Sequence, residues 1–239
     1  MVKIQKLIAN YKYIITLILI ILILILIIVN INVIIAIIYN IHLYLNSKFR
    51  YFYKDNKEST TGYWSAEQRK TSHRCSEDLA NFLINYYKNK NAKSVIDIGC
   101  GDGSYVYRLR NNGINAYGVD NNNTNNDLIR FDLSEEYINP KEYVQSFEVG
   151  EHIPKKYEDQ FFDNICNNAE RGIIMSWALP GQGGDGHVNE LPVSYVIKSV
   201  EMRGFKLNKI ETKKIRESIT RYTLSFIYFR YNLLIFDRI

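Results

Sequence analysis

The longest apolar stretch of the chain lies near its N-terminus. Residues 14–38 are apolar except for one threonine and two asparagines, and residues 13–47 contain no Asp, Glu, Lys or Arg. As an α-helix, a stretch of this length would extend about 37 Å, more than the ~30 Å hydrocarbon core of a bilayer. It is too long for the core of a cleaved signal peptide, and it is apolar on all faces, unlike a helix of a small soluble core. We therefore predict one uncleaved transmembrane helix over residues 13–38, after a short flank of residues 1–12.

The residues after this stretch have the composition of a membrane–water interface. Six aromatic and three basic side chains fall between Tyr39 and Lys54, a mixture that is typical of such interfaces. Residues 39–71 are therefore predicted to be a juxtamembrane linker. Three lysines also precede the apolar stretch, so the charge bias only leans towards a cytosolic C-terminal part. The three cysteines have no metal-ligand spacing and indicate reduced thiols, which favours the same orientation.

From residue 76 onwards, strand-like apolar runs alternate with helical spacings. Ser76 can cap a helix in which positions 79, 82, 83 and 86 share one face. Further helices are predicted around 105–111, 157–169 and 192–204, the last of which begins at a proline and ends at a glycine. Strands are predicted at residues 94–99, 115–120, 128–133, 143–148, 172–178, 206–212 and 224–231.

This alternation predicts an α/β fold, with helices on both faces of a mainly parallel sheet. We expect a Rossmann-like domain over residues 72–239 with a seven-stranded sheet, to which the C-terminal strands add an antiparallel edge strand. One connection is unusually short, because only seven residues separate Asp120 from Leu128. A parallel crossover normally needs about a dozen residues or more. The helix expected in this connection must therefore be reduced to a turn.

The distribution of charge restricts the partners of this domain. The chain has a formal net charge of +5, and its first 50 residues hold five cationic and no anionic side chains. The remaining residues are therefore neutral overall, without the excess of positive charge that nucleic acids attract. Nucleic acid is not the partner we expect.

A glycine-rich turn, VIDIGCGDG, follows the predicted strand at 94–99. In an open α/β sheet, ligands bind at the carboxyl ends of strands where the strand order reverses. Gly99, Gly101 and Gly103 have the spacing G-x-G-x-G, whereas a phosphate loop needs Gly-Lys-Ser/Thr and a dinucleotide site needs G-x-G-x-x-G. Asp97 lies two residues before the first glycine, where an acidic side chain can face a cationic group of a ligand.

These residues resemble the first motif of the class I S-adenosylmethionine-dependent methyltransferases, an apolar strand followed by an acidic residue and G-x-G-x-G. The next strand ends at Asp120, and the segment FDLS near the end of the third predicted strand supplies Asp132. The resemblance covers residues 76–231 and implies S-adenosylmethionine as cofactor, with the three glycines lining it. It also implies that Asp97 holds the methionine ammonium group, Asp120 the ribose hydroxyls and Asp132 the adenine amino group.

The loops after the fourth and fifth predicted strands carry a second group of polar residues. Glu148, Glu151 and His152 follow the fourth strand, and His187 lies in a glycine-rich loop after the fifth. Because both loops leave the same edge of the sheet, we expect these four residues beside the methyl donor. An imidazole has an unperturbed pKa of about 6.5, so either histidine suits a general base that deprotonates a hydroxyl or an amine. The glycine-rich loop is a plausible lid.

Two other interpretations of these four residues stay open. The pattern Glu-x-x-Glu-His with a later His is similar to the metal site of Hen1-type small-RNA 2′-O-methyltransferases, and a divalent metal would position and polarise a diol. The gap to His187 is shorter than in that family, and the neutral domain argues against RNA. In the third interpretation, Glu148 and His152 only cap the turn between strand and helix. We assign the four residues as catalytic and do not commit to metal ligands.

Together, these patterns predict a single-pass membrane protein with a cytosolic methyltransferase domain. Its acceptor would be a small molecule, a lipid or a protein. An inactive anchored binding module is the alternative from a different class, but such a module should have lost Asp97, Asp120 or a glycine of the turn. A nicotinamide-dependent oxidoreductase is disfavoured by the spacing of the glycines.

Overall fold

The structure, a computed structural model, describes residues 75–121, 126–220 and 224–239, together with scattered positions between 17 and 45. The predicted flank over 1–12 and nearly all of the predicted linker over 39–71 lie outside the described residues. The predicted transmembrane helix over 13–38 falls partly outside them, and its described positions are helical. Among the described residues, no helix is both long enough and apolar enough to cross a bilayer.

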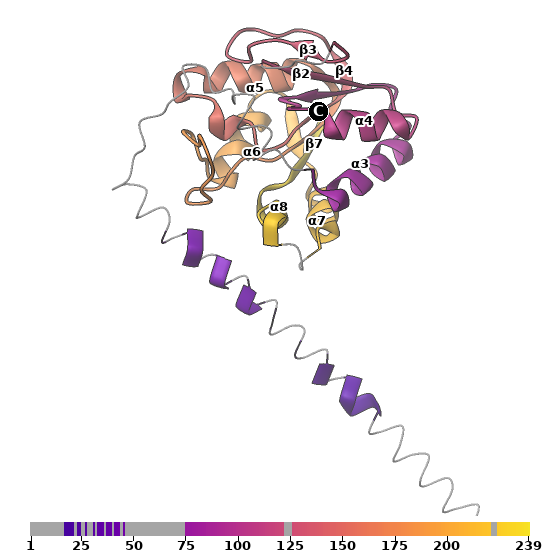
Figure 1. Ribbon diagram of the computed structural model, residues 1–239, viewed down its shortest axis with the longest axis vertical. Coiled ribbons are helices and arrows are strands. Elements are labelled where there is room, and N and C mark those ends of the chain that lie inside the picture. The colour runs from indigo at the N-terminus through magenta and orange to yellow at the C-terminus, as the bar shows by residue number, and fades with distance from the viewer. Residues whose placement is uncertain are drawn as a thin grey trace, which may run out of the picture.

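A seven-stranded sheet forms the centre of the domain, with the strand order β3-β2-β1-β4-β5-β7-β6 (Figure 1). β7 runs antiparallel to both β5 and β6, and the other neighbouring pairs are parallel. The predicted Rossmann-like, mainly parallel sheet is thereby confirmed, with its antiparallel pairing at the C-terminal end; β6 is the outermost strand there. The strands are β1 (Val95–Ile98), β2 (Ala116–Asp120), β3 (Ile129–Arg130), β4 (Lys141–Ser146), β5 (Ala169–Met175), β6 (Phe205–Leu207) and β7 (Leu234–Arg238).

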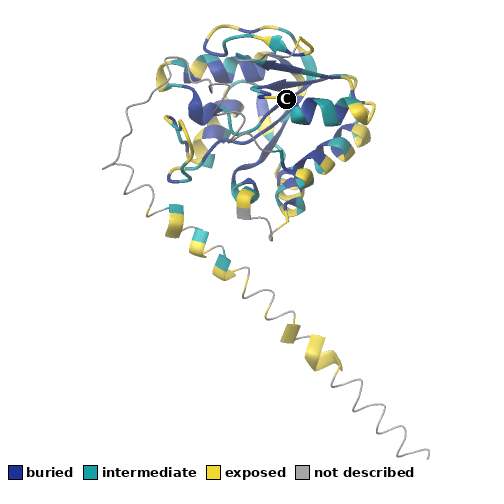
Figure 2. Ribbon diagram, viewed as in Figure 1, coloured by how far each residue is buried: buried dark blue, intermediate teal, exposed yellow. Residues whose placement is uncertain are grey.

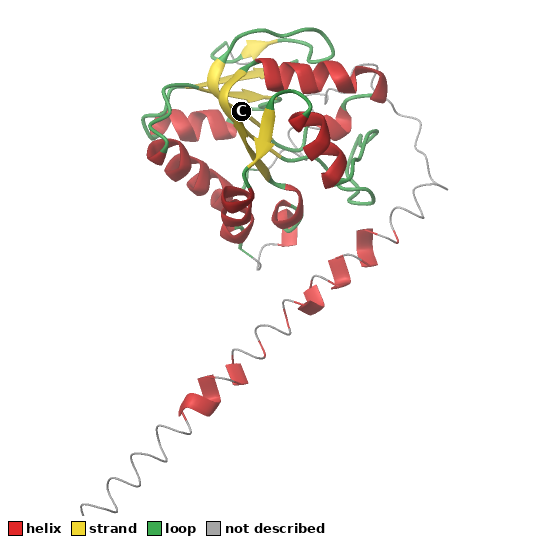
Figure 3. Ribbon diagram, turned by 180° about the vertical axis from the view of Figure 1, so that it is seen from behind, coloured by secondary structure: helices red, strands yellow, loops and turns green. Residues whose placement is uncertain are grey.

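Helices cover both faces of this sheet, as Figure 3 shows. One face packs against α3, α4, α7 and α8, and the other packs against α5 and α6. Figure 2 shows the strands as the most deeply buried layer between them. The helices are α3 (Glu77–Asn89), α4 (Ser104–Asn111), α5 (Glu158–Asn167), α6 (Val193–Glu201), α7 (Lys209–Ser218) and α8 (Phe229–Asn232).

The start of α3 agrees with the sequence pattern. The Ser76 hydroxyl accepts a hydrogen bond from the amide of Leu79 and so satisfies one free donor of the first turn. Leu79, Leu83 and Tyr86 are buried on the predicted face of the helix. This helix end is therefore specified locally.

The two predicted C-terminal strands are wrong in part. The strand expected at 206–212 is limited to β6, because Asn208 accepts a hydrogen bond from the amide of Glu211 and begins α7. Thr212 and Ile215 then lie three residues apart on the buried face of α7. The strand expected at 224–231 is instead a 3₁₀ turn (Leu224–Phe226) and α8, and the last strand is β7.

The short connection between β2 and β3 contains only turn structure at its described positions, which agrees with the predicted loss of the crossover helix. Residues 122–125 of this connection lie outside the description. β3 is also shorter than the predicted strand at 128–133. The pairing of Asp120 with Arg130 nevertheless continues the parallel sheet.

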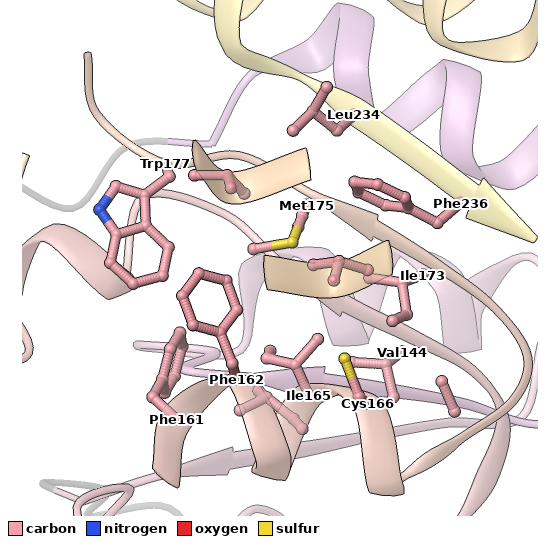
Figure 4. Close-up of a cluster of buried hydrophobic side chains, with 14 of the residues drawn as sticks. Val144, Phe161, Phe162, Ile165, Cys166, Ile173, Met175, Trp177, Leu234 and Phe236 are labelled. Carbon is pink, nitrogen blue, oxygen red and sulfur yellow. The ribbon is translucent and has the colours of Figure 1, made fainter. Parts of the chain in front are cut away.

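The core on the α5 and α6 side extends to the carboxyl edge of the sheet (Figure 4). The Phe162 ring stacks on the indole of Trp177 with centroids 5.0 Å apart, and the Phe161 ring meets the same indole edge-on at 5.9 Å. All three side chains are almost completely buried. Because Trp177 lies just after β5, this packing fixes the start of the loop that leaves β5.

We predict that Phe162→Ala lowers the free energy of unfolding by about 3–5 kcal/mol, because it leaves a cavity against Trp177. The exposed control Ile138→Ala should change it by less than about 0.5 kcal/mol. Urea unfolding followed by circular dichroism measures both values. A loss below about 1 kcal/mol for Phe162→Ala would contradict this packing role.

Candidate active site

The glycine turn after β1 touches the loop after β4. Gly99, Gly101 and Gly103 have φ values of +82°, +58° and +81°, a region that favours glycine. A Cβ atom at position 99 would lie 2.5 Å from Cγ2 of Val149. The absence of a side chain at Gly99 therefore allows the turn to pack directly against the segment that carries Glu148 and Glu151.

Asp97 is held at the end of β1 by a buried chain of hydrogen bonds. Its carboxylate accepts a hydrogen bond from Nε2 of Gln145 at 3.0 Å, and Oε1 of Gln145 accepts one from the Tyr87 hydroxyl at 3.1 Å. The side chains of Asp97 and Gln145 are buried. The position of the carboxylate is thus fixed by β4 and α3.

Asp120 and Asp132 lie at the carboxyl ends of the next two strands in the sheet, β2 and β3. Oδ2 of Asp120 accepts a hydrogen bond from the amide of Gly101 at 3.0 Å, which joins β2 to the glycine turn. Oδ1 of Asp132 accepts hydrogen bonds from the amide and the hydroxyl of Ser134 at 3.0 and 2.8 Å. The structure thus places the three predicted cofactor carboxylates along one edge, and their contacts with a cofactor stay a prediction.

Glu148 is the most highly hydrogen-bonded of the predicted catalytic residues. Its φ of +54° is unusual for a residue with a side chain. The Ser176 hydroxyl accepts a hydrogen bond from the Glu148 amide and donates one to its carboxylate, which also accepts from Asn232 and Gln182. Burial raises the pKa of this carboxyl, whereas the hydrogen bond from Ser176 and the charge of His187 lower it. The segment that follows β5 and the helix α8 both contribute to holding the group.

Glu151 presents the opposite situation. It lies in a 3₁₀ turn (Gly150–His152), its side chain is fully buried, and neither carboxylate oxygen has a hydrogen-bond partner among the described residues. Burial raises its pKa well above the usual value, and the charge of Glu148 raises it further. The backbone amides of Glu151 and Ala178 lower the pKa, but they do not reach hydrogen-bond geometry. This carboxylate is therefore a buried acceptor without a donor.

The loop between β5 and α6 folds back onto this turn. The Glu151 carbonyl accepts hydrogen bonds from the amides of Val188 and Asn189 at 2.8 and 2.9 Å. The indole of Trp177 donates to the Asn189 carbonyl at 2.6 Å. At Gly150, a Cβ atom would lie 2.2 Å from the Trp177 ring. The two loops are therefore packed tightly, and His187 is brought next to Glu151.

Glu190 orients His187 and also holds the loop. Its Oε1 lies 3.0 Å from Nδ1 of His187, and its carboxylate accepts hydrogen bonds from the amides of Gly181 and Gly183 at 2.7 and 2.9 Å. Our sequence analysis missed this residue. The available signal was an acidic side chain three residues after His187, in a glycine-rich loop whose amides need acceptors.

Three of the four predicted catalytic residues form one cluster. Nε2 of His187 lies 3.9 Å from Oε1 of Glu151, and the rings of His152 and His187 meet edge-on with centroids 4.9 Å apart. Nδ1 of His152 lies 3.2 Å from the carbonyl oxygen of Gly186. One ligand atom each from Glu151, His152 and His187 lies within 4.8 Å of the other two, so the group could hold a metal ion. Glu148 is close enough for the charge of His187 to affect its pKa.

Comparisons with known proteins identify the fold. No protein-family model matches the sequence, and no curated protein is significantly similar to it. Among solved structures, the sugar N-methyltransferase KedS8 from Streptoalloteichus has a TM-score of 0.54 at 12% identity, over 75% of this chain and 97% of that one. The amino pentose methyltransferase CalS10 from Micromonospora echinaspora, with S-adenosylmethionine bound, has a TM-score of 0.52 at 9% identity, over 74% and 98%.

The magnesium protoporphyrin IX methyltransferase ChlM from Synechocystis, also with S-adenosylmethionine bound, has a TM-score of 0.50 at 16% identity, over 72% of this chain and 89% of that one. At identities this low, the structural similarity establishes the fold alone. The resemblance predicted from the sequence is confirmed at that level. The chain has the fold of the class I S-adenosylmethionine-dependent methyltransferases.

Proposed function

We propose that the protein is a membrane-anchored S-adenosylmethionine-dependent methyltransferase that acts on a small-molecule, lipid or protein acceptor. The observation that carries this proposal is the contact of Gly99 with Val149, which joins the glycine turn to the loop of Glu148 and Glu151. This contact supports the proposal that a methyl-donor site and a group of acid–base residues share one edge of the sheet. Such an arrangement suits transfer of a group from a bound donor to an adjacent acceptor.

The residues at the ends of β1 and β2 fit the donor. S-adenosylmethionine supplies a methyl group on a positively charged sulfonium sulfur. The buried Asp97 carboxylate would bind the ammonium group of its methionine moiety, and Asp120 would bind its ribose hydroxyls. The left-handed glycines bring backbone rather than side chains towards the ligand. Gln145 and Tyr87 keep the Asp97 carboxylate in place before the ligand arrives.

His187 is the residue best placed to receive the acceptor's proton. Glu190 accepts a hydrogen bond from Nδ1, which leaves the lone pair on Nε2. In the transfer, an oxygen or nitrogen of the acceptor forms a bond to the methyl carbon, and the carbon–sulfur electron pair returns to sulfur. The acceptor's proton passes to Nε2 of His187 and then to solvent. His152, whose Nδ1 faces the Gly186 carbonyl, is oriented in the same way.

Metal-assisted methyl transfer is the second candidate, and the buried Glu151 favours it. A buried carboxylate without hydrogen-bond donors is costly unless a cation or a proton neutralises it. Glu151, His152 and His187 offer a carboxylate oxygen and two imidazole nitrogens, which suit divalent transition metals. Bound there, such a metal would polarise a hydroxyl of the acceptor.

The N-terminal stretch supports the proposed anchor. Fifteen large apolar side chains at described positions between Leu17 and Leu45 are 46–60% exposed. Exposed apolar surface of this extent needs a lipid or protein environment. The three cysteines are free thiols, which agrees with a domain on the cytosolic side, where the methyl donor is made.

Our first test is calorimetric titration of the full-length protein in detergent with S-adenosylhomocysteine, the demethylated product. Asp97→Asn keeps the shape of the side chain but removes its charge, and should weaken binding at least about tenfold. Asp159→Asn on the exposed side of α5 is the matched control and should leave affinity unchanged. Absence of binding by the folded protein, or equal affinity in Asp97→Asn, would contradict the proposed donor site.

The metal-assisted candidate predicts that the protein binds Mn²⁺ and that Glu151→Gln weakens this binding at least about tenfold, because a neutral amide replaces an anionic ligand. Electron paramagnetic resonance of free Mn²⁺ measures the affinity. The exposed substitution Glu135→Gln is the control. No saturable binding at millimolar Mn²⁺ would exclude this candidate and leave His187 as a general base.

The positioning role of Glu190 predicts that Glu190→Gln loosens the loop. An amide has one acceptor oxygen and cannot replace both carboxylate oxygens, so at least one of the Gly181 and Gly183 amides loses its partner. Loss of about 1.4 kcal/mol would speed hydrogen exchange in residues 179–190 roughly tenfold. Glu170→Gln on β5 is the control. Unchanged exchange would show that Glu190 does not hold the loop.

A further inference from the structure

One face of the N-terminal helix is turned towards the domain. Ile35, Tyr39 and Leu43 follow one another at intervals of four residues and are half-buried. Ile34, Ile37, Ile38 and Ile41, which lie beside them, are 52–60% exposed. Figure 2 shows this change along the segment, with partly buried turns only near the domain. Residues at i, i+4 and i+8 share a helix face, so this stripe is a contact surface.

Of these three side chains, Tyr39 has an identified contact with a residue of the domain. Its ring stacks on Tyr231 of α8 with centroids 4.7 Å apart and an interplanar angle of 18°. The next residue, Asn232, donates hydrogen bonds to the Glu148 carboxylate at 2.8 Å and to the Trp177 carbonyl at 3.2 Å. Tyr39 of the N-terminal helix thus contacts the residue that precedes Asn232, whose side chain holds Glu148. Figure 1 shows this helix on the side of the domain where α8 lies.

The Tyr39 hydroxyl belongs to the ring that stacks on Tyr231. Its oxygen is buried and has no hydrogen-bond partner among the described residues. Burial raises the pKa of this phenol, and the charges of Glu148, Tyr231 and Glu190 raise it further. These charges agree with the stacking of Tyr39 on Tyr231, the neighbour of the residue that holds Glu148.

The position of Tyr39 in the sequence relates this contact to the bilayer. Tyr39 directly follows the apolar residues 14–38, and Ile35, one turn earlier, is on the same contact face. At 1.5 Å per residue, the two lie about 6 Å apart along the helix axis, comparable to the thickness of one headgroup layer. If residues 13–38 span the membrane, the contact of Tyr39 with Tyr231 lies at the level of the lipid headgroups, and the candidate site lies beside it.

We propose that the methyl acceptor is a lipid-like amphiphile that enters from the bilayer surface, and that Tyr39 forms part of the wall along which it passes. This inference rests on the proposed methyltransferase function. The reacting group would be a hydroxyl or amine near the headgroup, and its proton would leave to His187 as the new bond to the methyl carbon forms. The apolar part of the acceptor would stay beside the exposed apolar side chains of the helix.

The geometry is tested first, in the full-length protein reconstituted in phosphatidylcholine vesicles. Tyr39→Cys combined with Tyr231→Cys should be joined by a short bismaleimide and detected as a cross-linked peptide by mass spectrometry. Tyr39→Cys with Ile138→Cys is the matched control. Ile138 is exposed and lies just before β4, where that strand begins, and the candidate site lies where the strand ends. Burial raises the pKa of Cys75 to about 11 and that of Cys166 to about 12, so these native thiols react slowly. Equal yields for the two pairs would overturn the contact.

The acceptor class is tested with methyl-tritiated S-adenosylmethionine and the full-length protein in a second set of vesicles, prepared from the total lipid extract of the cells that make the protein. We expect tritium in the organic phase, reduced at least about tenfold by Tyr39→Ala and largely retained by Tyr39→Phe, which keeps the stacked ring. A parallel reaction receives the soluble metabolites and proteins of the same cells. Label found only there, or in neither fraction, would overturn the lipid acceptor.

Binding of S-adenosylhomocysteine separates this inference from the proposed function. Tyr39→Ala should leave that affinity within about twofold, since Tyr39 is placed beside the acceptor. If the protein binds S-adenosylhomocysteine but does not label lipid, the lipid acceptor fails and the methyltransferase proposal stands. If it binds neither S-adenosylhomocysteine nor S-adenosylmethionine, both proposals fail.

Discussion

The close packing of Gly99 on Val149 is the constraint on which the candidate site depends. A side chain at position 99 would occupy the space of the Val149 side chain, and the φ of +82° also favours glycine. β1 and β4 are neighbours in the sheet, so their following loops must share one small space. Only a residue without a side chain at position 99 lets both loops stay there. The glycine motif therefore shapes both the proposed donor side of the site and the neighbouring loop of Glu148 and Glu151.

The carboxylates of Glu148 and Glu151, which follow β4, have different hydrogen-bonding environments. Glu148 is surrounded by donors from Ser176, Gln182 and Asn232, whereas Glu151 is fully buried without one. Interacting groups with different environments are typical of functional sites rather than of structural turns. Because Asn232 lies beside Tyr231, the same network also connects the site to the N-terminal helix.

Local sequence patterns predicted the central sheet well, whereas the cofactor roles of Asp97, Asp120 and Asp132 stay a prediction from the resemblance. The runs that became β1, β2, β4 and β5 each contain apolar strand-like residues, and Asp97 was identified by its place before the glycine turn, whereas the role of Asp120 came from the resemblance. The C-terminal elements were less predictable, because the Asn208 cap and the buried face of α7 compete with a strand-like pattern. Gln145, Ser176 and Glu190 were not foreseen, since their roles depend on partners brought close only by the fold. The spacing of apolar residues cannot reveal such pairings.

The central claim is that donor and acceptor residues form one site at the carboxyl edge of β1, β2 and β4. Hydrogen–deuterium exchange of the full-length protein, with and without saturating S-adenosylhomocysteine, tests it most directly. We predict slower exchange in residues 98–104 at the glycine turn and in residues 148–153 of the adjoining loop. Protection confined to other parts of the chain, or no protection at all, would contradict the claim.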